Sequence, residues 1–291
     1  MKTTSFKTIA IIGLGLIGGS LGKRIIRKLP DTQVIGVDKD PNTIKIANQK
    51  KIVHIATTNI KLAVKKADLV ILATPIEAIF SQFIEASKHA KKGTIIIDVA
   101  STKSKIVSQI ETISSTNVYF VGGHPMAGSE KTGILSADHK ILKKACFVLT
   151  QTQKTNKKAI KKLIYFIETL GMRSLVISPD IHDLLVAAVS HLPYLVSISL
   201  TSTINNLSSY KKEISQLVAG GFRDTTRIAS SCPIWAREVL TTNHVSITNL
   251  LDIYNQQLHL LINKLQLYQY SDLEDYFRNA KIFRDSIYEE R

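Results

Sequence analysis

His124 is the residue of this chain best suited to moving a proton. It stands in the string GGHPMAG at 122–128, directly after an apolar run at 118–121 that predicts a buried strand. Imidazole changes its charge near neutral pH, so a His in a glycine-rich loop at a strand end suits general acid–base catalysis. Most isolated loop histidines are structural or solvated, so it is the position after a strand that favours a catalytic role.

Two further stretches offer polar groups that could bind a substrate. Arg223 and Arg227 lie in the glycine-led run AGGFRDTTRIA at 219–229, and a guanidinium is a planar fork that matches a carboxylate. Ser101 follows the strand that ends at Asp98, and its hydroxyl could reach a substrate. A surface loop with incidental arginines explains the first pattern equally well, and a helix cap explains Ser101.

The string GLGLIG at 13–18 fits the glycine fingerprint of a dinucleotide site. It follows an apolar strand at 9–12 and opens a helical pattern. In such a turn the first glycine permits the tight bend, the second admits a pyrophosphate and the third lets helix and strand pack closely. The N–H groups at the start of the helix then face the phosphates. The residues expected to contact the cofactor here are Gly13, Gly15, Leu16, Ile17 and Gly18.

Asp38 favours NAD as the cofactor. It ends the second apolar run, 34–37, and lies 20 residues after Gly18, where an acid that binds a ribose diol is expected. An NADP phosphate would place like charge beside it, at a cost of up to about 4 kcal/mol per unit charge at about 4 Å. Lys39 could offset part of this cost. Thr74 and Pro75, after the third strand, are expected to shape the cofactor pocket.

These residues need a sheet that collects strand ends at one edge. Apolar runs alternate with helical stretches up to residue 178, which predicts a Rossmann-like, doubly wound α/β sheet, mostly parallel and covered on both faces. Ligands bind beyond the carboxyl ends of such strands. The expected strands are 9–12, 34–37, 69–73, 94–98, 118–121, 147–150 and 175–177.

After residue 178 long helical patterns replace this alternation. We therefore expect two domains, 1–178 binding NAD and 179–291 forming an all-helical substrate and dimerisation domain. Pro193 is expected to kink the first long helix and free a backbone carbonyl. The abundant apolar helical surface favours a homodimer. The expected helices are 181–205, 210–218, 233–241, 245–268 and 271–288.

Composition narrows the class of protein. The chain has 291 residues, is 44% hydrophobic, and carries 38 Lys+Arg against 23 Asp+Glu, a net charge of +15. The lysines are scattered without interleaved aromatics, which favours a solvated basic surface that attracts anionic substrates over nucleic-acid binding. No apolar run is expected to span a bilayer. Cys146 and Cys232 indicate neither a disulfide framework nor a metal cluster, as is typical of a cytoplasmic protein.

The motifs taken together resemble those of the prephenate/arogenate dehydrogenases of tyrosine biosynthesis. The resemblance rests on the glycine loop, DVASTK at 98–103, GGHPMAG at 122–128, and HLP at 191–193 with GGFRDTTRIA and PIW behind it. It covers roughly residues 8–270, in the expected order. The family implies hydride transfer from a cyclohexadienyl ring carbon to NAD, with loss of carbon dioxide and aromatisation of the ring.

The resemblance also implies roles for single residues. His124 matches the His that takes the proton of the ring hydroxyl, and Ser101 matches a residue that hydrogen-bonds this hydroxyl and the His. Arg227 matches the Arg that grips a substrate carboxylate. Glu130 and Asp224 match positions of an ionic gate near the site.

One position departs from the family pattern. Many members carry a second His three residues after the position of His191, where it contacts substrate, but here that residue is Tyr194. This leaves the choice between prephenate and arogenate open. A 3-hydroxyacid dehydrogenase would need a catalytic Lys on the helical part, and none comparable is found there. A basic nucleic-acid-binding protein is the third alternative.

Overall fold

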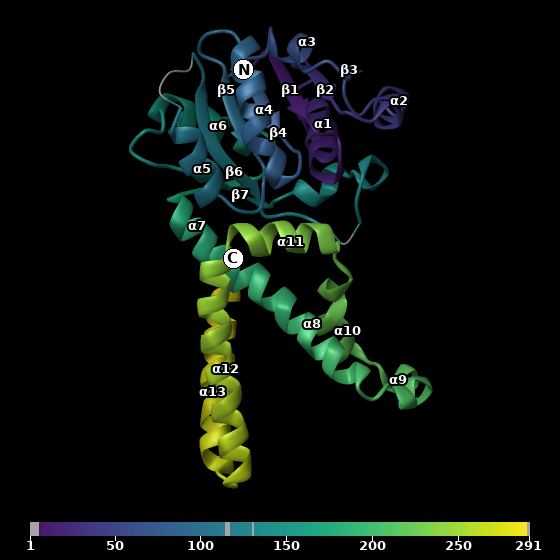
Figure 1. Ribbon diagram of the computed structural model, residues 1–291, viewed down its shortest axis with the longest axis vertical. Coiled ribbons are helices and arrows are strands. Elements are labelled where there is room, and N and C mark those ends of the chain that lie inside the picture. Colours follow the sequence, from purple (N-terminus) through teal and green to yellow (C-terminus); the bar gives the residue numbers. More distant parts are fainter. Residues whose placement is uncertain (1–5, 114–116, 130, 290–291) are drawn as a thin grey trace. The chain divides into compact units, whose positions relative to one another are not determined.

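The computed structural model describes residues 6–113, 117–129 and 131–289. The chain forms two compact units, the first ending at His244 and the second beginning at Val245 (Figure 1). The first unit holds a sheet and the helices around it. The second is a pair of helices.

The first unit is built on an eight-stranded sheet with the order β3-β2-β1-β4-β5-β6-β7-β8. Neighbouring strands are parallel except β6 and β7, which are antiparallel. This arrangement confirms the predicted doubly wound, mostly parallel α/β sheet. The strands are β1 (Thr8–Ile12), β2 (Gln33–Val37), β3 (Ile55–Thr57), β4 (Leu69–Leu72), β5 (Ile95–Asp98), β6 (Tyr119–Pro125), β7 (Cys146–Thr150) and β8 (Arg173–Ile177).

Helices cover both faces of this sheet, which explains why the strands read as unbroken apolar runs. In β1, Ile9 and Ile11 belong to one buried apolar cluster, and Ala10 and Ile12 belong to the other. Alternate residues of a strand point to opposite faces, so both faces must be apolar. The covering helices are α1 (Leu16–Lys28), α2 (Pro41–Gln49), α3 (Ile60–Val64), α4 (Ile76–His89), α5 (Ser104–Glu111) and α6 (Lys157–Thr169), with short 3₁₀ turns η1 (Ile134–Ser136) and η2 (His139–Leu142).

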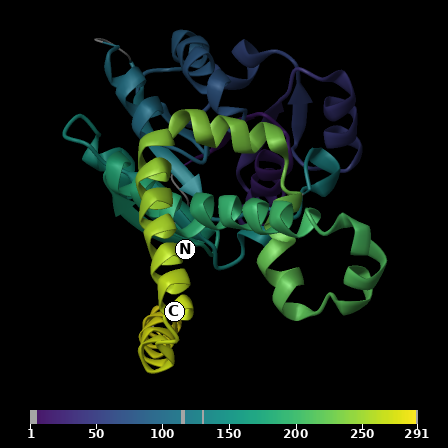
Figure 2. The same ribbon diagram turned by 60° about the horizontal axis from the view of Figure 1, so that its bottom comes forward.

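The rest of the first unit is helical, as predicted. Figure 2 shows α8 and α11 running across one end of the sheet. Pro193 stands in the first turn of α8, directly after a π-helical turn that interrupts the ladder of helical hydrogen bonds. The elements are α7 (Pro179–Val186), η3 (Ala187–His191), α8 (Leu192–Asn205), η4 (Ser208–Tyr210), α9 (Lys211–Leu217), α10 (Gly220–Thr226), η5 (Arg227–Ser230) and α11 (Pro233–Thr242).

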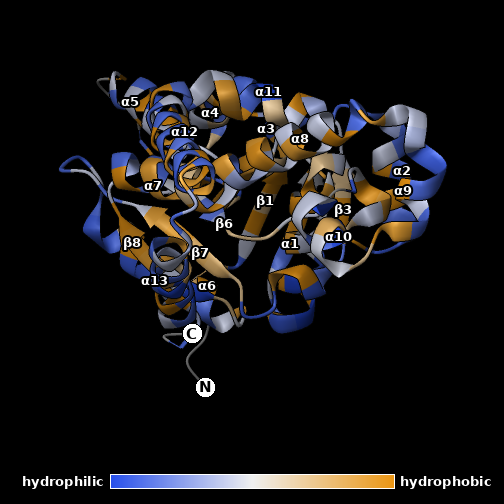
Figure 3. Cartoon of the chain, turned by 90° about the horizontal axis from the view of Figure 1, so that it is seen from below, coloured by the Kyte–Doolittle hydropathy of each residue, from blue (hydrophilic) through white to orange (hydrophobic). Residues whose placement is uncertain are grey.

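The helical stretch Pro179–Asn205 is unusually apolar. It has 27 residues and a mean hydropathy of 1.7, so by length and composition alone it could cross a membrane, contrary to the sequence expectation. Figure 3 shows apolar residues along α8. The same stretch buries the polar side chains His182, Asp183 and His191 inside the first unit. Its exposed apolar side chains on α7 and the π turn are Ile181, Leu184, Leu185 and Val189.

The second unit contains α12 (His244–Gln266), whose first residue still belongs to the first unit, and α13 (Tyr270–Glu289), close to the predicted ranges. Two polar contacts join these helices: Lys264 pairs with Asp272 at 2.9 Å, and the Tyr276 hydroxyl donates to Gln257 at 3.0 Å. Their turn includes Tyr268 in the left-handed region, at φ 54°.

Three local predictions were wrong. The short strand β3 was missed. His124 lies inside β6 rather than in a loop, because the antiparallel partner β7 pairs with the strand through Pro125. The run 219–229, expected to be a loop, forms α10 and the start of η5.

Candidate active site

At two positions of the fingerprint, neighbouring backbone atoms lie so close that only glycine fits. Gly13 has φ +95°, and a Cβ there would lie 2.4 Å from the carbonyl oxygen of Ala73. A Cβ on Gly18 would lie 1.9 Å from the carbonyl oxygen of Gly13. Such distances cannot be relieved without moving backbone, so the turn between β1 and α1 packs tightly on the end of β4.

Gly15 differs, because a Cβ there would meet nothing within 4 Å. It precedes the first residue of α1, Leu16, and the helix has no side-chain cap at this end and no acidic residue in its first turn. The first N–H groups of a helix lack partners within the helix, and they attract phosphates. The space and the donors at this turn therefore fit a dinucleotide pyrophosphate.

Asp38 is held beside this turn by backbone donors. Its Oδ2 accepts from the Leu14 N–H at 2.9 Å and its Oδ1 accepts from the Asp40 N–H at 3.0 Å. The half-buried carboxylate keeps lone pairs that a ribose diol could use. Across the turn, the Thr74 hydroxyl donates to Gln82 at 2.7 Å, and Pro75 directly precedes α4.

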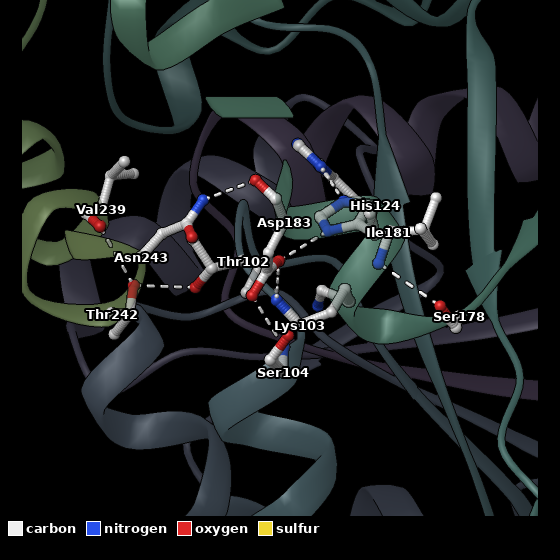
Figure 4. A network of polar contacts seen from close by, with 12 residues as sticks. Thr102, Lys103, Ser104, His124, Ser178, Ile181, Asp183, Val239, Thr242 and Asn243 are labelled. Carbon is white, nitrogen blue, oxygen red and sulfur yellow. Dashed lines mark hydrogen bonds and ion pairs between the residues drawn. The ribbon is translucent and has the colours of Figure 1, made fainter. Parts of the chain in front are cut away.

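His124 faces a second buried histidine. Its Nδ1 lies 2.9 Å from Nε2 of His182, on α7, and Nδ1 of His182 lies 2.8 Å from Oδ1 of Asp183. His182 is fully buried and Asp183 nearly so. The three side chains therefore form a continuous row from the end of β6 to the start of α5, and Figure 4 labels its two ends, His124 and Asp183.

Asp183 is the centre of this polar network (Figure 4). Its Oδ1 also accepts from the Lys103 N–H at 2.7 Å, and its Oδ2 accepts from the Ser104 N–H at 2.9 Å. Burial opposes ionisation of this carboxyl, but the hydrogen bonds from His182, Ser104 and Lys103 hold its pKa below the ordinary value. Asp183 therefore stays ionised while it caps the start of α5.

A buried ion pair lies next to this network. The Lys103 ammonium pairs with Asp98, and both side chains are fully buried. Asp98 also accepts from the backbone N–H groups of Ala100, at 3.0 Å, and Gly123, at 3.2 Å. Burial lowers the pKa of Lys103, and the neighbouring Asp98 opposes that shift. The pair fixes the end of β5 against the glycines that precede His124.

The surroundings keep His124 neutral. Burial lowers its pKa well below the usual range, and the nearby His182, Lys103 and His191 lower it further. Among the residues that the structure describes, no group of three or more His, Cys, Asp or Glu side chains could hold a metal ion. A neutral imidazole with one buried partner is suited to accept a proton.

Aromatic side chains line the region next to Ser101. The Trp235 indole N–H donates to the Ser101 hydroxyl at 3.1 Å, and the Tyr194 ring meets the indole edge-on at 5.5 Å. The His191 ring also packs edge-on against this indole, with 6.3 Å between the ring centroids, and it is almost fully buried. Burial lowers the pKa of His191 to about 4. Ser101 does not cap α5, which begins at Ser104.

Three hydrogen bonds tie α11 and the residue after it to neighbouring elements. Glu238 accepts from the Ile76 N–H at 3.2 Å, at the start of α4, and the hydroxyls of Thr102 and Thr242 are 2.8 Å apart. Asn243 donates to the carbonyl of Asp183 at 2.7 Å. We call these contacts the α11 bridges.

Two further predicted residues lie in the helical part of the first unit. Asp224 on α10 and Arg227 on η5 are exposed, and η5 packs against α8, which begins next to His191. Glu130 lies outside the described residues. The roles of all three stay predictions.

The partners of His124 were not predicted from the sequence. His182 and Asp183 come from a helix that begins 55 residues later in the chain. The one local signal was a His-Asp pair just after the helix-starting Pro179. Trp235 was quoted as part of a motif but was given no role.

Comparisons with known proteins identify the family. Residues 21–176 match the family model of the prephenate dehydrogenase nucleotide-binding domain, and residues 178–279 match that of the prephenate dehydrogenase dimerization domain. The chain belongs to the prephenate dehydrogenase family. Prephenate dehydrogenase of Bacillus subtilis is 33% identical over 281 residues, which cover 96% of this chain and 76% of that protein.

Solved structures of prephenate dehydrogenases and their relatives share the fold. The prephenate dehydrogenase of A. aeolicus, crystallised with hydroxyphenyl propionate and NAD+, is 30% identical with a TM-score of 0.89, and the match covers 98% of this chain and 100% of that one. Synechocystis arogenate dehydrogenase is 30% identical with a TM-score of 0.82, covering 96% and 99%. The predicted family, fold class and NAD-dependent dehydrogenase activity are thereby confirmed.

Proposed function

We propose that this chain catalyses the NAD-dependent oxidative decarboxylation of prephenate to 4-hydroxyphenylpyruvate in tyrosine biosynthesis. The observation that carries the proposal is His124, kept neutral at the carboxyl edge of a dinucleotide-binding sheet. The named relatives of B. subtilis and A. aeolicus support prephenate as the substrate.

The chain's own residues then have distinct tasks. His124 takes the proton of the ring hydroxyl while Ser101, oriented by Trp235, hydrogen-bonds the same hydroxyl. Arg227 binds a substrate carboxylate, and His191 and Tyr194 contact the substrate side chain. NAD, held by the glycine turn and Asp38, would supply the acceptor for the hydride of ring carbon 4, and aromatisation would drive the loss of carbon dioxide. Glu130 and Asp224 are the proposed ionic gate.

An initial-rate assay tests this function directly. Purified protein is given prephenate or arogenate with NAD or NADP, and reduced nicotinamide is followed by absorbance. We expect turnover with prephenate and NAD. Turnover with arogenate alone would make arogenate, not prephenate, the substrate. The likeness to Synechocystis arogenate dehydrogenase and the phenol of Tyr194 are consistent with that outcome. Silence in all combinations, with NAD binding intact, would reject the proposal.

Asp38→Ala is expected to relax the discrimination against NADP. The carboxylate would repel a 2′-phosphate, and its removal also deletes the acceptor for the ribose diol. The ratio of kcat/KM for NAD to that for NADP should fall at least tenfold. Asp31→Ala, at an exposed acid before β2, is the matched control. A wild-type preference for NADP would contradict the cofactor assignment.

Arg227→Ala is expected to raise the KM for prephenate while leaving the KM for NAD within twofold. A hydrogen bond to a charged group contributes about 1.5–3 kcal/mol, which corresponds to roughly 10- to 150-fold in KM. Arg223→Ala, one helical turn earlier on α10, is the control. If the KM for prephenate is unchanged, the carboxylate is bound elsewhere.

We further propose a cytoplasmic homodimer that binds neither nucleic acid nor membrane, with residues 1–178 binding NAD and 179–291 binding substrate and the second subunit. The apolar side chains exposed on α7 and the match of 178–279 to a dimerization-domain model support the dimer. Light scattering on the purified protein tests it. A monomer at micromolar concentration would contradict it.

A further inference from the structure

With both imidazole rings neutral, the row His124, His182 and Asp183 has a single arrangement of protons that satisfies all its contacts. Asp183 is ionised and accepts two backbone N–H groups, so it has no proton to donate. The 2.8 Å contact to Nδ1 of His182 therefore needs a proton on that nitrogen. A neutral His182 ring carries one N–H, so its Nε2 is left as an acceptor.

The tautomer of His182 determines the tautomer of His124. Nε2 of His182 can only accept, so the proton in the 2.9 Å contact must sit on Nδ1 of His124. Neutral His124 then has its lone pair on Nε2, the nitrogen that does not face His182. That is the tautomer a general base needs when the substrate lies on the Nε2 side.

We propose that His182 and Asp183 are positioning residues that fix the reactive tautomer and orientation of His124. The proposal rests on the proposed function only for the identity of the proton donor, the ring hydroxyl. This proton moves to Nε2 of His124, while Nδ1–H of His124 stays hydrogen-bonded to His182.

The charges of the buried side chains around His124 also favour transfer of the proton to this ring. With both rings neutral before proton transfer, the Lys103–Asp98 ion pair and the Asp183 carboxylate bring one positive and two negative charges to the cluster. The cluster thus holds one unbalanced negative charge. The proton that arrives on His124 neutralises it, and it does so in a region where charges are weakly screened.

Variants at His182 test this role. His182→Leu removes the acceptor for His124, and kcat is expected to fall about 10²-fold, between the losses that outer-shell partners and a wrong tautomer cause. The Kd of NAD should stay unchanged, because the glycine turn is untouched. His182→Gln offers an amide oxygen to Nδ1 of His124 and should keep kcat within about tenfold of wild type.

Asp183→Asn tests the direction in which the hydrogen bonds of the row are donated, from His124 through His182 to Asp183. An amide that turns its NH₂ toward His182 forces the opposite tautomer on both rings, and kcat should fall more than in His182→Gln. A wild-type kcat in His182→Leu would overturn the proposal. Equal losses in His182→Leu and His182→Gln, with both proteins folded, would also overturn it, since a structural role alone predicts that result.

A measurement on the unaltered protein does not depend on how the variants fold. With ¹⁵N-labelled histidine, NMR distinguishes protonated from unprotonated ring nitrogens, and the His124 signals are those absent in His124→Asn. We expect a proton on Nδ1 of His124 and on Nδ1 of His182. A proton on Nε2 of neutral His124 would reject the proposal. No substrate is needed, so a silent prephenate assay would reject the proposed function without affecting this result.

Discussion

His124→Asn is expected to lower kcat with prephenate by about two to four orders of magnitude, the usual contribution of a positioned acid–base group. Asparagine keeps an amide that can hydrogen-bond His182 but has no nitrogen that accepts a proton at neutral pH. The Kd of NAD should stay within twofold, because the glycine turn and Asp38 lie on other strand ends. Steady-state kinetics and NAD titration measure both effects.

The control for this substitution is His89→Asn. His89 lies in the last turn of α4, at the opposite end from the strand edge that carries His124, and its ring contacts Glu85 at 3.1 Å. Its replacement should leave kcat unchanged. A near-normal kcat in His124→Asn would remove His124 from the mechanism.

Lys103→Met is expected to lower the free energy of unfolding by about 3–5 kcal/mol, because it leaves the buried Asp98 carboxylate without its counter-ion. Methionine fills much of the space of the lysine stem, so loss of charge rather than loss of volume dominates. Urea unfolding followed by circular dichroism measures the change. A loss below about 1 kcal/mol would show that Asp98 is compensated by other groups.

Two further variants separate charge from position. Lys105→Met changes an exposed lysine two residues away and should alter the free energy of unfolding by less than about 0.5 kcal/mol. The double variant Lys103→Met/Asp98→Asn removes both charges and should recover part of the loss. Full recovery is not expected, because Asp98 also accepts from the backbone N–H groups of Ala100 and Gly123.

The sequence predicted the strands well because the sheet is buried on both faces. Runs such as Ile9–Ile12 and Leu69–Leu72 are apolar without alternation, and each became a strand. Strand β3 escaped notice because it is three residues long and lies at the edge of the sheet, with no fully buried residue. Short edge strands leave little hydrophobic signal.

The candidate site was harder to predict, because contacts between distant residues decide it. Paired glycines before His124 suggested a loop, yet a Cβ on Gly123 would lie 2.7 Å from the carbonyl oxygen of Asp98. These glycines are needed where strands approach closely, not where the chain turns. The partnership of His124 with His182 depends on how α7 packs on the sheet, and the His-Asp pair after Pro179 was its one local signal in the sequence.

The α11 bridges oppose an opening motion of α11 away from the elements that it contacts. A hinge opening between α11 and the start of α4 would break the hydrogen bond between the Ile76 N–H and the Glu238 carboxylate, at a net cost of about 1.5–3 kcal/mol for a bond to a charged group. The Thr102–Thr242 contact would add to that barrier. We therefore expect the closed arrangement of α11 to be the predominant one, with an open form as a minor population.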